Sequence, residues 1–184
     1  MKKIFFTSVF AIMAIFGANA QVTVNARIGG GILSDRYHGE TKISGKVDIQ
    51  ANIAFSKDKR WVVSPTIDFT TDLLETHQLC LPVLFGYKIP IGRNQLFIPK
   101  VGPFAGIELA SGTALYGPSA EFAFEINHFV IALNGYYSFG KFKSHYTYTT
   151  SYYSSYSNSW SYYTNTGSEK NSCFNVSLTL GYKF

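Results

Sequence analysis

Apolar and polar side chains alternate with a period of two from Val22 onward, and this alternation is typical of β-strands whose two faces meet different surroundings. It is clearest in the last twelve residues of the chain. One face of that segment would carry Phe174, Val176, Leu178, Leu180, Tyr182 and Phe184, and the other Cys173, Asn175, Ser177, Thr179, Gly181 and Lys183. The end of the chain is therefore predicted to be a strand with one apolar and one polar face.

Seven further segments repeat this pattern, so the sequence predicts an all-β fold of eight antiparallel strands. The expected strands span residues 22–32, 46–55, 61–70, 79–89, 96–109, 115–126, 129–142 and 173–184. Short connections are expected at 56–59, 92–94 and 127–128, and longer ones at 34–43, 71–78, 110–113 and 143–172. Tight turns on one side and loops on the other are typical of an up-and-down transmembrane β-barrel, and an even strand number would put both termini on the short-turn side.

The composition of the polar face separates a soluble barrel from a membrane barrel. A soluble barrel of the lipocalin kind turns its apolar face inward, and its polar face would be rich in Lys and Glu. Here the polar face carries many Ser, Thr and Asn together with Gly29, Gly31, Gly86, Gly102, Gly106, Gly117, Gly140 and Gly181. Small residues suit the crowded interior of an eight-stranded barrel, so we expect polar side chains inside and apolar side chains facing lipid.

Aromatic residues on the apolar face gather near the strand ends, as expected for two girdles at membrane interfaces. One group comprises Phe55, Trp61, Tyr87, Phe97, Phe124, Phe129 and Tyr182, and the other Phe69, Tyr116, Tyr137, Phe139 and Phe174. Aromatic residues make up 17% of the chain and charged residues only 15%, yet beyond residue 20 no apolar run is long enough for a membrane-spanning helix. A closed barrel satisfies every backbone hydrogen-bonding group in lipid, and an open sheet does not.

Residues 1–20 have the features of a cleaved secretory signal peptide. Lys2 and Lys3 precede an apolar run at 4–16, which is followed by a segment ending in Ala-Asn-Ala. This run has 13 residues, fewer than the roughly 20 of a spanning helix. Residues 21–184 would then form one outer-membrane β-barrel domain. This domain has 14 Lys and Arg and 11 Asp and Glu, and so small a positive net charge does not indicate a nucleic-acid partner.

Cys80 and Cys173 would meet an oxidising compartment, so a disulfide has to be considered. The expected strand order puts the two residues on opposite walls of the barrel. That separation exceeds the roughly 7 Å between Cα atoms that a disulfide tolerates. Two free thiols are therefore the favoured interpretation, and a disulfide is the alternative.

Ionisable side chains of both signs would share the barrel interior. They are Arg27, Lys46, Lys88, Lys100 and Lys183, with Asp48, Asp68, Glu108, Glu121 and Glu125. If a tight hairpin turns at 111–112, Lys100 would lie diagonal to Glu121, close enough to form an ion pair. Charges removed from water need partners, so we interpret the set as a structural ion-pair plug, and the alternative is a polar path for protons or small ions.

Three residue patterns carry a resemblance to a known family. The final segment, Leu178-Thr179-Leu180-Gly181-Tyr182-Lys183-Phe184, resembles a terminal assembly signal with alternating apolar residues and a final aromatic. The segment 79–87 has a central proline, Pro82, and the mature chain would open on Gln21. The chain thereby resembles the outer-membrane β-barrel family, the small porin-like barrels related to OmpX, and Gln21 is similar to exported proteins of Bacteroidetes.

This resemblance implies a place in the outer membrane of a Gram-negative bacterium. Both termini would be periplasmic, and the longer loops would lie at the cell surface. The implied partners are outer-membrane lipid and the barrel-assembly machinery, which would read Leu178, Leu180, Tyr182 and Phe184.

We expect neither enzyme activity nor a metal or other cofactor. The histidines His38, His77, His128 and His145 fall in expected loops or turns, and no two have the spacing of metal ligands. Lipid A-modifying enzymes also use eight-stranded barrels, but such a hydrolase needs a Ser nucleophile beside a His and an acidic residue, and no local motif supports this. A lipid-modifying enzyme is therefore only a remote alternative.

The segment 145–166 sets aromatic residues among Ser, Thr and Asn, with no charged residue after His145. Its aromatic residues are Tyr146, Tyr148, Tyr152, Tyr153, Tyr156, Trp160, Tyr162 and Tyr163. Tyr and Trp offer large contact areas at low entropic cost, and Ser and Asn offer adaptable hydrogen bonds, as in antibody paratopes. Alternation at Tyr146-Thr147-Tyr148 also suggests that the last hairpin extends beyond the membrane as an exposed ribbon.

We therefore expect a structural or adhesion-like barrel with a plugged lumen, which would bind a host or cell-surface glycan or protein through this long loop. Two alternatives stay open. The loop could be a variable surface segment without a specific ligand, or the barrel could be a narrow channel or transporter for small solutes or ions.

Overall fold

The computed structural model describes residues 21–34, 41–56, 58–72, 76–154 and 159–184. In this part of the chain every regular element is a β-strand. The strands are β1 (Gln21–Ser34), β2 (Thr41–Ala54), β3 (Trp61–Thr71), β4 (His77–Tyr87), β5 (Ile89–Gly92), β6 (Gln95–Glu108), β7 (Thr113–Ile126), β8 (Phe129–Ser154) and β9 (Ser159–Lys183). Among the residues described, no helix is long and apolar enough to cross a membrane.

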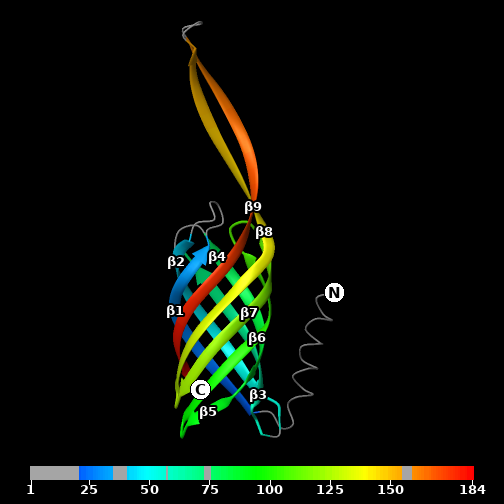
Figure 1. Cartoon of the computed structure of the whole chain (residues 1–184), viewed down its shortest axis with the longest axis vertical. Helices are drawn as coiled ribbons and strands as arrows, with labels where there is room; N and C mark the ends of the chain where they lie inside the picture. The colour runs from blue at the N-terminus through cyan, green and yellow to red at the C-terminus, as the bar shows by residue number, and fades with distance from the viewer. Residues whose placement is uncertain (1–20, 35–40, 57, 73–75, 155–158) are drawn as a thin grey trace.

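The strands form a closed antiparallel barrel of eight strands (Figure 1). Consecutive strands pair with each other except β4 and β5, and two further pairings, β1 with β9 and β4 with β6, close the sheet. The short strand β5 is not a separate strand of the barrel: it pairs only with β6 and continues the path of β4 after a break at Lys88. The register with β6 is the same on both sides of Lys88, and the amide of Lys88 donates to the carbonyl of Arg60 at 2.8 Å, next to the pair Trp61 and Tyr87. The expected eight-stranded all-β barrel is confirmed, and the expected strand over 79–89 is interrupted only at Lys88, between β4 and β5.

Where side chains are described, burial alternates along the strands of the barrel with the polar face inside, and only the short β5 is exposed throughout. In β4, for example, Gln78, Cys80 and Leu84 are buried while Leu81 and Phe85 are exposed. Throughout the barrel the buried set contains charged residues and amides, whereas the exposed set is dominated by Ile, Val, Leu and aromatic side chains. The expected orientation of the two faces is confirmed, and it inverts the arrangement of a soluble protein.

Glycines on the polar face allow the first and last strands to meet closely. A Cβ atom on Gly29 would lie 2.0 Å from the carbonyl oxygen of Leu178, and one on Gly31 would lie 2.0 Å from that of Val176. Both distances are far shorter than any van der Waals contact. The seam between β1 and β9 therefore requires the absence of a side chain at these two positions.

The β8–β9 hairpin continues beyond the barrel. These strands have 26 and 25 residues, whereas the other seven have between 4 and 14. After an irregularity between Ser138 and Phe142, the register runs without interruption from Phe142 opposite Asn171 to Ser154 opposite Ser159. Thirteen residues per strand correspond to a ribbon about 40 Å long, and Figure 1 shows it rising from one end of the barrel. The expected loop at 143–172 is therefore mostly strand, as the alternation at residues 146–148 suggested.

The opposite end of the barrel carries the short turns. They connect β2 to β3, β5 to β6 and β7 to β8, and the last of them is only Asn127-His128. Gln21 pairs with Ala54 beside the first of these turns, and Phe184 donates its amide to the carbonyl of Val24 at 2.9 Å. The start of β1 and the end of the chain thus share the short-turn end, as expected.

Candidate functional site

An ion-pair network centred on Glu121 fills the middle of the barrel. The carboxylate of Glu121 accepts hydrogen bonds from Lys100 Nζ at 2.7 Å and from Gln50 Nε2 at 3.1 Å. It also pairs with Arg27 Nη2 at 2.9 Å, and Arg27 Nε pairs with Asp48 at 2.6 Å. All five side chains are buried. Two cations and two carboxylates are therefore joined across the interior of the barrel.

The strand register brings these groups together. Lys100 lies directly opposite Glu121 on β6 and β7, and Arg27 lies directly opposite Asp48 on β1 and β2. The expected ion pair of Lys100 with Glu121 is confirmed. The two residues lie directly opposite each other and not diagonally, because the turn between Glu108 and Thr113 takes four residues, 109–112. The pairing that crosses the lumen, Arg27 with Glu121, depends on closure of the barrel.

A second set of contacts extends the polar layer on one side. Lys46 forms an ion pair with Asp68 on the neighbouring strand β3, and donates to the side-chain amide oxygen of Asn134 at 2.5 Å. Lys100 also donates to Gln50 at 2.6 Å and to Asn52 at 3.0 Å. Amide side chains thus complete the coordination of the buried ammonium groups, as burial of a charge requires.

Four residues expected in the plug lie away from this central layer, namely Glu108, Glu125, Lys183 and Lys88. Glu108 accepts hydrogen bonds from the backbone amides of Ala110 at 3.1 Å and Ser111 at 2.6 Å, so it holds the β6–β7 turn. Glu125 pairs with Lys183 at 2.8 Å at the short-turn end of the barrel. Lys88 is half-buried at that same end. The central layer therefore comprises Arg27, Lys46, Asp48, Asp68, Lys100 and Glu121.

Two apolar clusters inside the barrel were not anticipated from the sequence. One, which we call the hairpin-side cluster, contains Leu33, Cys80, Phe104, Leu115, Tyr136 and Cys173. The other, the mouth-side cluster, contains Ala54, Val62, Ile98, Ala123, Val130 and Ala132, with Leu96 packed against it. The available signal was a set of apolar residues at inward-phase positions, such as Ile98 and Phe104 in β6. They lie on either side of the ion-pair layer.

Cys80 and Cys173 are free and buried within the hairpin-side cluster. They belong to β4 and β9, which lie four strands apart around the eight-stranded ring, so opposite walls are confirmed. Gln78 Nε2 lies 3.1 Å from the sulfur of Cys173, and Tyr136 donates its hydroxyl to the side-chain oxygen of Gln78. The thiols therefore act as packing groups in this structure.

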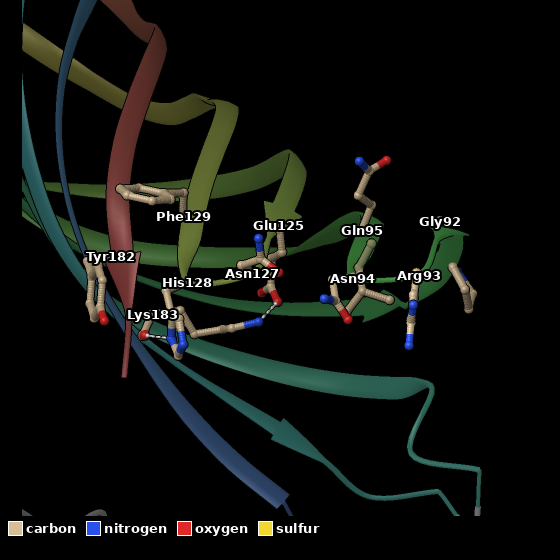
Figure 2. A pocket seen from close by; sticks show the side chains of 12 residues that line it. Gly92, Arg93, Asn94, Gln95, Glu125, Asn127, His128, Phe129, Tyr182 and Lys183 are labelled. Atoms are coloured by element: carbon tan, nitrogen blue, oxygen red, sulfur yellow. Dashed lines mark hydrogen bonds and ion pairs between the residues drawn. The ribbon is translucent and has the colours of Figure 1, made fainter.

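Two adjoining cavities open at the short-turn end. The larger, of about 900 Å³, lies against the β5–β6 turn, the β7–β8 turn and the end of β9 (Figure 2). Lys183 extends across it to Glu125, and the ring of His128 lies 3.3 Å from the backbone oxygen of Lys183 (Figure 2). The smaller cavity, of about 300 Å³, shares Pro90, Leu96, Glu125 and Lys183 with the larger one. Sequence reasoning did not identify this mouth, because its residues come from five separate segments.

Outward-facing aromatic rings contact one another within each of the expected groups. At the short-turn end Trp61 lies 5.0 Å from Tyr87, and Phe97 lies 4.8 Å from Phe124. At the hairpin end Phe139 contacts both Tyr116 and Tyr137, at 6.4 and 5.7 Å between ring centroids. The residues of the terminal segment, Leu178, Leu180, Tyr182 and Phe184, are all exposed on the outer face.

The hairpin presents aromatic and hydroxyl side chains near its tip. Trp160 and Tyr162 are 58% and 69% exposed, and they lie on the same face because they are two residues apart on β9. Ser151 lies opposite Tyr162, and Thr149 lies opposite Thr164, so these hydroxyls share that face. The side chains of Tyr146, Tyr148, Tyr152, Tyr153 and Tyr163, and all of Tyr156, lie outside the described part of the chain.

Neither a known family nor a characterised relative identifies the chain. No family model matches it, and comparison with curated proteins finds no significant match. Within the described residues, no group of three or more His, Cys, Asp or Glu side chains is arranged to hold a metal ion. His77 binds Thr71 at 2.8 Å, His128 stacks on Tyr182, and His38 and the side chain of His145 lie outside the described residues.

Proposed function

We propose that this chain is an outer-membrane β-barrel that holds a Tyr-rich hairpin above the cell surface as a recognition element, and that it is not an enzyme. The observation that carries the proposal is the inverted distribution of side chains. Ion pairs and amides are enclosed, whereas Ile, Val, Leu and aromatic side chains cover the outside. Water would penalise this outer surface, and the hydrocarbon interior of a bilayer would favour it.

The ends of the barrel support a specific orientation. Short turns and the end of the chain lie at one end, and the long hairpin lies at the other (Figure 1). Exported barrels place short turns in the periplasm and longer connections outside the cell. Both termini of the mature chain would therefore be periplasmic, and the hairpin would be extracellular. This proposal agrees with the resemblance to small porin-like barrels related to OmpX.

The interior supports an anchor in preference to a channel. A conducting pore needs a continuous aqueous path, but here the ion-pair layer lies between the hairpin-side and mouth-side clusters. Eight strands enclose only enough space for side chains. The long hairpin is then the element that distinguishes the protein, and its aromatic and hydroxyl side chains suit contact with a glycan or protein on another surface.

The hairpin can be shortened in register to test this function. Residues 144–169 would be replaced by Asn-Gly, which joins the paired Lys143 and Lys170 by a two-residue turn. We expect the full chain and the shortened chain to fractionate equally with the outer membrane and to shift in gel mobility on boiling. Cells displaying the full chain are expected to bind members of an array of neutral and acidic glycans and surface proteins, and cells displaying the shortened chain are expected to lose that binding.

Each part of the proposal can fail separately in this experiment. Recovery of the full chain as a soluble periplasmic protein without a mobility shift would contradict the membrane barrel. Equal binding by the full and shortened chains would leave the barrel intact and contradict the role of the hairpin. A variant with Trp160→Ala and Tyr162→Ala keeps the full length of the hairpin. Loss of binding in this variant would show that these side chains are needed, whereas normal binding would show that the length of the hairpin is what matters.

Deletion of Phe184 is expected to reduce assembly in cells far more than it reduces stability. Its side chain is 74% exposed and contacts the neighbouring Tyr182 ring at 5.1 Å, so little buried structure depends on it. The measurements are the yield of heat-modifiable protein in the outer-membrane fraction and the urea midpoint of the purified, refolded barrel. Phe129→Ala, which removes another exposed girdle ring, is the control. Normal yield after deletion of Phe184 would show that it carries no assembly signal.

A further inference from the structure

The smaller cavity at the short-turn mouth is lined by an excess of positive charge. Its charged side chains are Lys59, Arg60, Lys88 and Lys183, against Asp58 and Glu125. They come from the β2–β3 turn, the break between β4 and β5, and the ends of β7 and β9. Four cations from three separate parts of the fold therefore surround one space of about 300 Å³ with only two carboxylates.

Ion pairs within the mouth account for two of these cations. Lys183 pairs with Glu125 at 2.8 Å, and Arg60 lies 3.7 Å from Asp58. Among the described residues, neither Lys59 nor Lys88 has an ion-pair partner. The mouth thus retains two ammonium groups whose charge is not balanced locally.

Hydrogen bonds fix the backbone at both lysines and so place the bases of both side chains at the mouth. Lys59 adopts a φ of 55°, a left-handed conformation that non-glycine residues seldom occupy, and its amide donates to Ser56 at 2.9 Å. The amide of Lys88 is fixed on the carbonyl of Arg60 at 2.8 Å. Burial lowers the pKa of Lys88, the carboxylate of Glu125 partly opposes this, and the nearby Lys183 and Lys59 lower it further. An anion bound between these groups would offset the desolvation cost of the Lys88 ammonium group. It would also reduce the repulsion between the lysines.

Apolar side chains lie between the smaller cavity and the ion-pair layer. Leu96 lines both mouth cavities and packs against the mouth-side apolar cluster. A ligand that enters from the short-turn end therefore meets apolar side chains before it reaches the ion-pair layer. This geometry suits retention of a ligand at the mouth and does not suit its passage through the barrel.

We propose that this mouth binds a phosphate monoester dianion between Lys59 and Lys88. A phosphate monoester carries about −1.5 to −2 charge near neutral pH, which matches two unbalanced ammonium groups better than a single carboxylate does. Ammonium groups bind phosphate oxygens through short charge-assisted hydrogen bonds. The phosphate could belong to a soluble compound or to a lipid headgroup. The inference concerns the opposite end of the molecule from the hairpin and does not depend on the hairpin's role.

Calorimetric titration of the refolded mature chain in neutral detergent tests the site. At pH 7.5 and constant ionic strength, we expect saturable binding of inorganic phosphate and of sulfate, and much weaker binding of acetate. Glycerol 3-phosphate and mixed micelles containing phosphatidic acid distinguish the two sources of phosphate. Saturation by glycerol 3-phosphate indicates a soluble ligand, and saturation by phosphatidic acid alone indicates a lipid headgroup.

Matched variants locate the site. Lys88→Gln and, separately, Lys59→Gln are expected to weaken phosphate affinity about tenfold each, because each removes one charge-assisted hydrogen-bond donor. Lys42→Gln, at the opposite end of the barrel, changes the net charge equally and is expected to have no effect. A boiling-dependent mobility shift shows that each variant is folded. Absence of saturable binding, acetate binding as tight as phosphate, or equal weakening by Lys42→Gln would overturn the proposal.

Discussion

Replacement of Glu121 by Gln is expected to lower the free energy of unfolding of the barrel by about 3–5 kcal/mol, the usual effect of breaking a buried ion pair. The buried carboxylate of Glu121 pairs with Arg27 and accepts hydrogen bonds from Lys100 and Gln50. The amide keeps the shape of the side chain but removes its charge. Lys100 would then have no carboxylate partner among the residues it contacts, and Arg27 would keep only Asp48.

Urea unfolding of the refolded protein in lipid vesicles, followed by gel mobility without boiling, measures this change. Glu125→Gln is the matched control, because its partner Lys183 is partly exposed at the mouth and water can solvate the ammonium group that is left. We expect its effect to be below about 1 kcal/mol. The double variant Lys100→Met and Glu121→Gln should recover part of the loss, since it also removes the uncompensated cation. Equal effects of Glu121→Gln and Glu125→Gln would show that the central layer adds no particular stability.

Substitution of Gly31 by Ala is expected to prevent most molecules from closing into a barrel. The added Cβ atom would lie 2.0 Å from the carbonyl oxygen of Val176 and 2.5 Å from the Cα atom of Ser177. Backbone atoms on both sides of the β1–β9 seam would have to move apart. Because each strand of a closed barrel is fixed by two neighbours, such a shift would disrupt hydrogen bonds along the whole seam.

The measurement is the fraction of refolded protein that migrates as the compact, heat-modifiable form. We expect the compact band to be nearly absent for Gly31→Ala and for Gly29→Ala. Gly45→Ala is the control, because the nearest atom to its added Cβ, the carbonyl oxygen of Thr71, is 4.0 Å away. A normal compact band for Gly31→Ala would mean that the seam tolerates a wider strand spacing than the structure has.

The strands and their orientation could be predicted because the relevant signal is local. Adjacent side chains of a strand point to opposite faces, so a period of two in the sequence reports two environments without knowledge of which strand is the neighbour. The alternation within segments such as 173–184 therefore predicted both that the segment is a strand and which of its side chains face the interior. The charged interior residues could be named for the same reason.

The mouth cavities could not be predicted in this way. Their walls come from five separate segments, among them the β2–β3 turn, the break at Lys88 and the end of β9. Alternation within one strand carries no information about which turns lie side by side at the end of a closed barrel.

The sequence by itself determined that this chain forms eight two-faced strands with charges on the inner face and aromatic residues near the ends of the outer face. Only the tertiary structure decided that Arg27 reaches Glu121 and that two apolar clusters lie on either side of the ion pairs. The physical reason is that side-chain alternation is fixed by backbone geometry within one strand. Contacts across the lumen are fixed by the register and closure of all eight strands together.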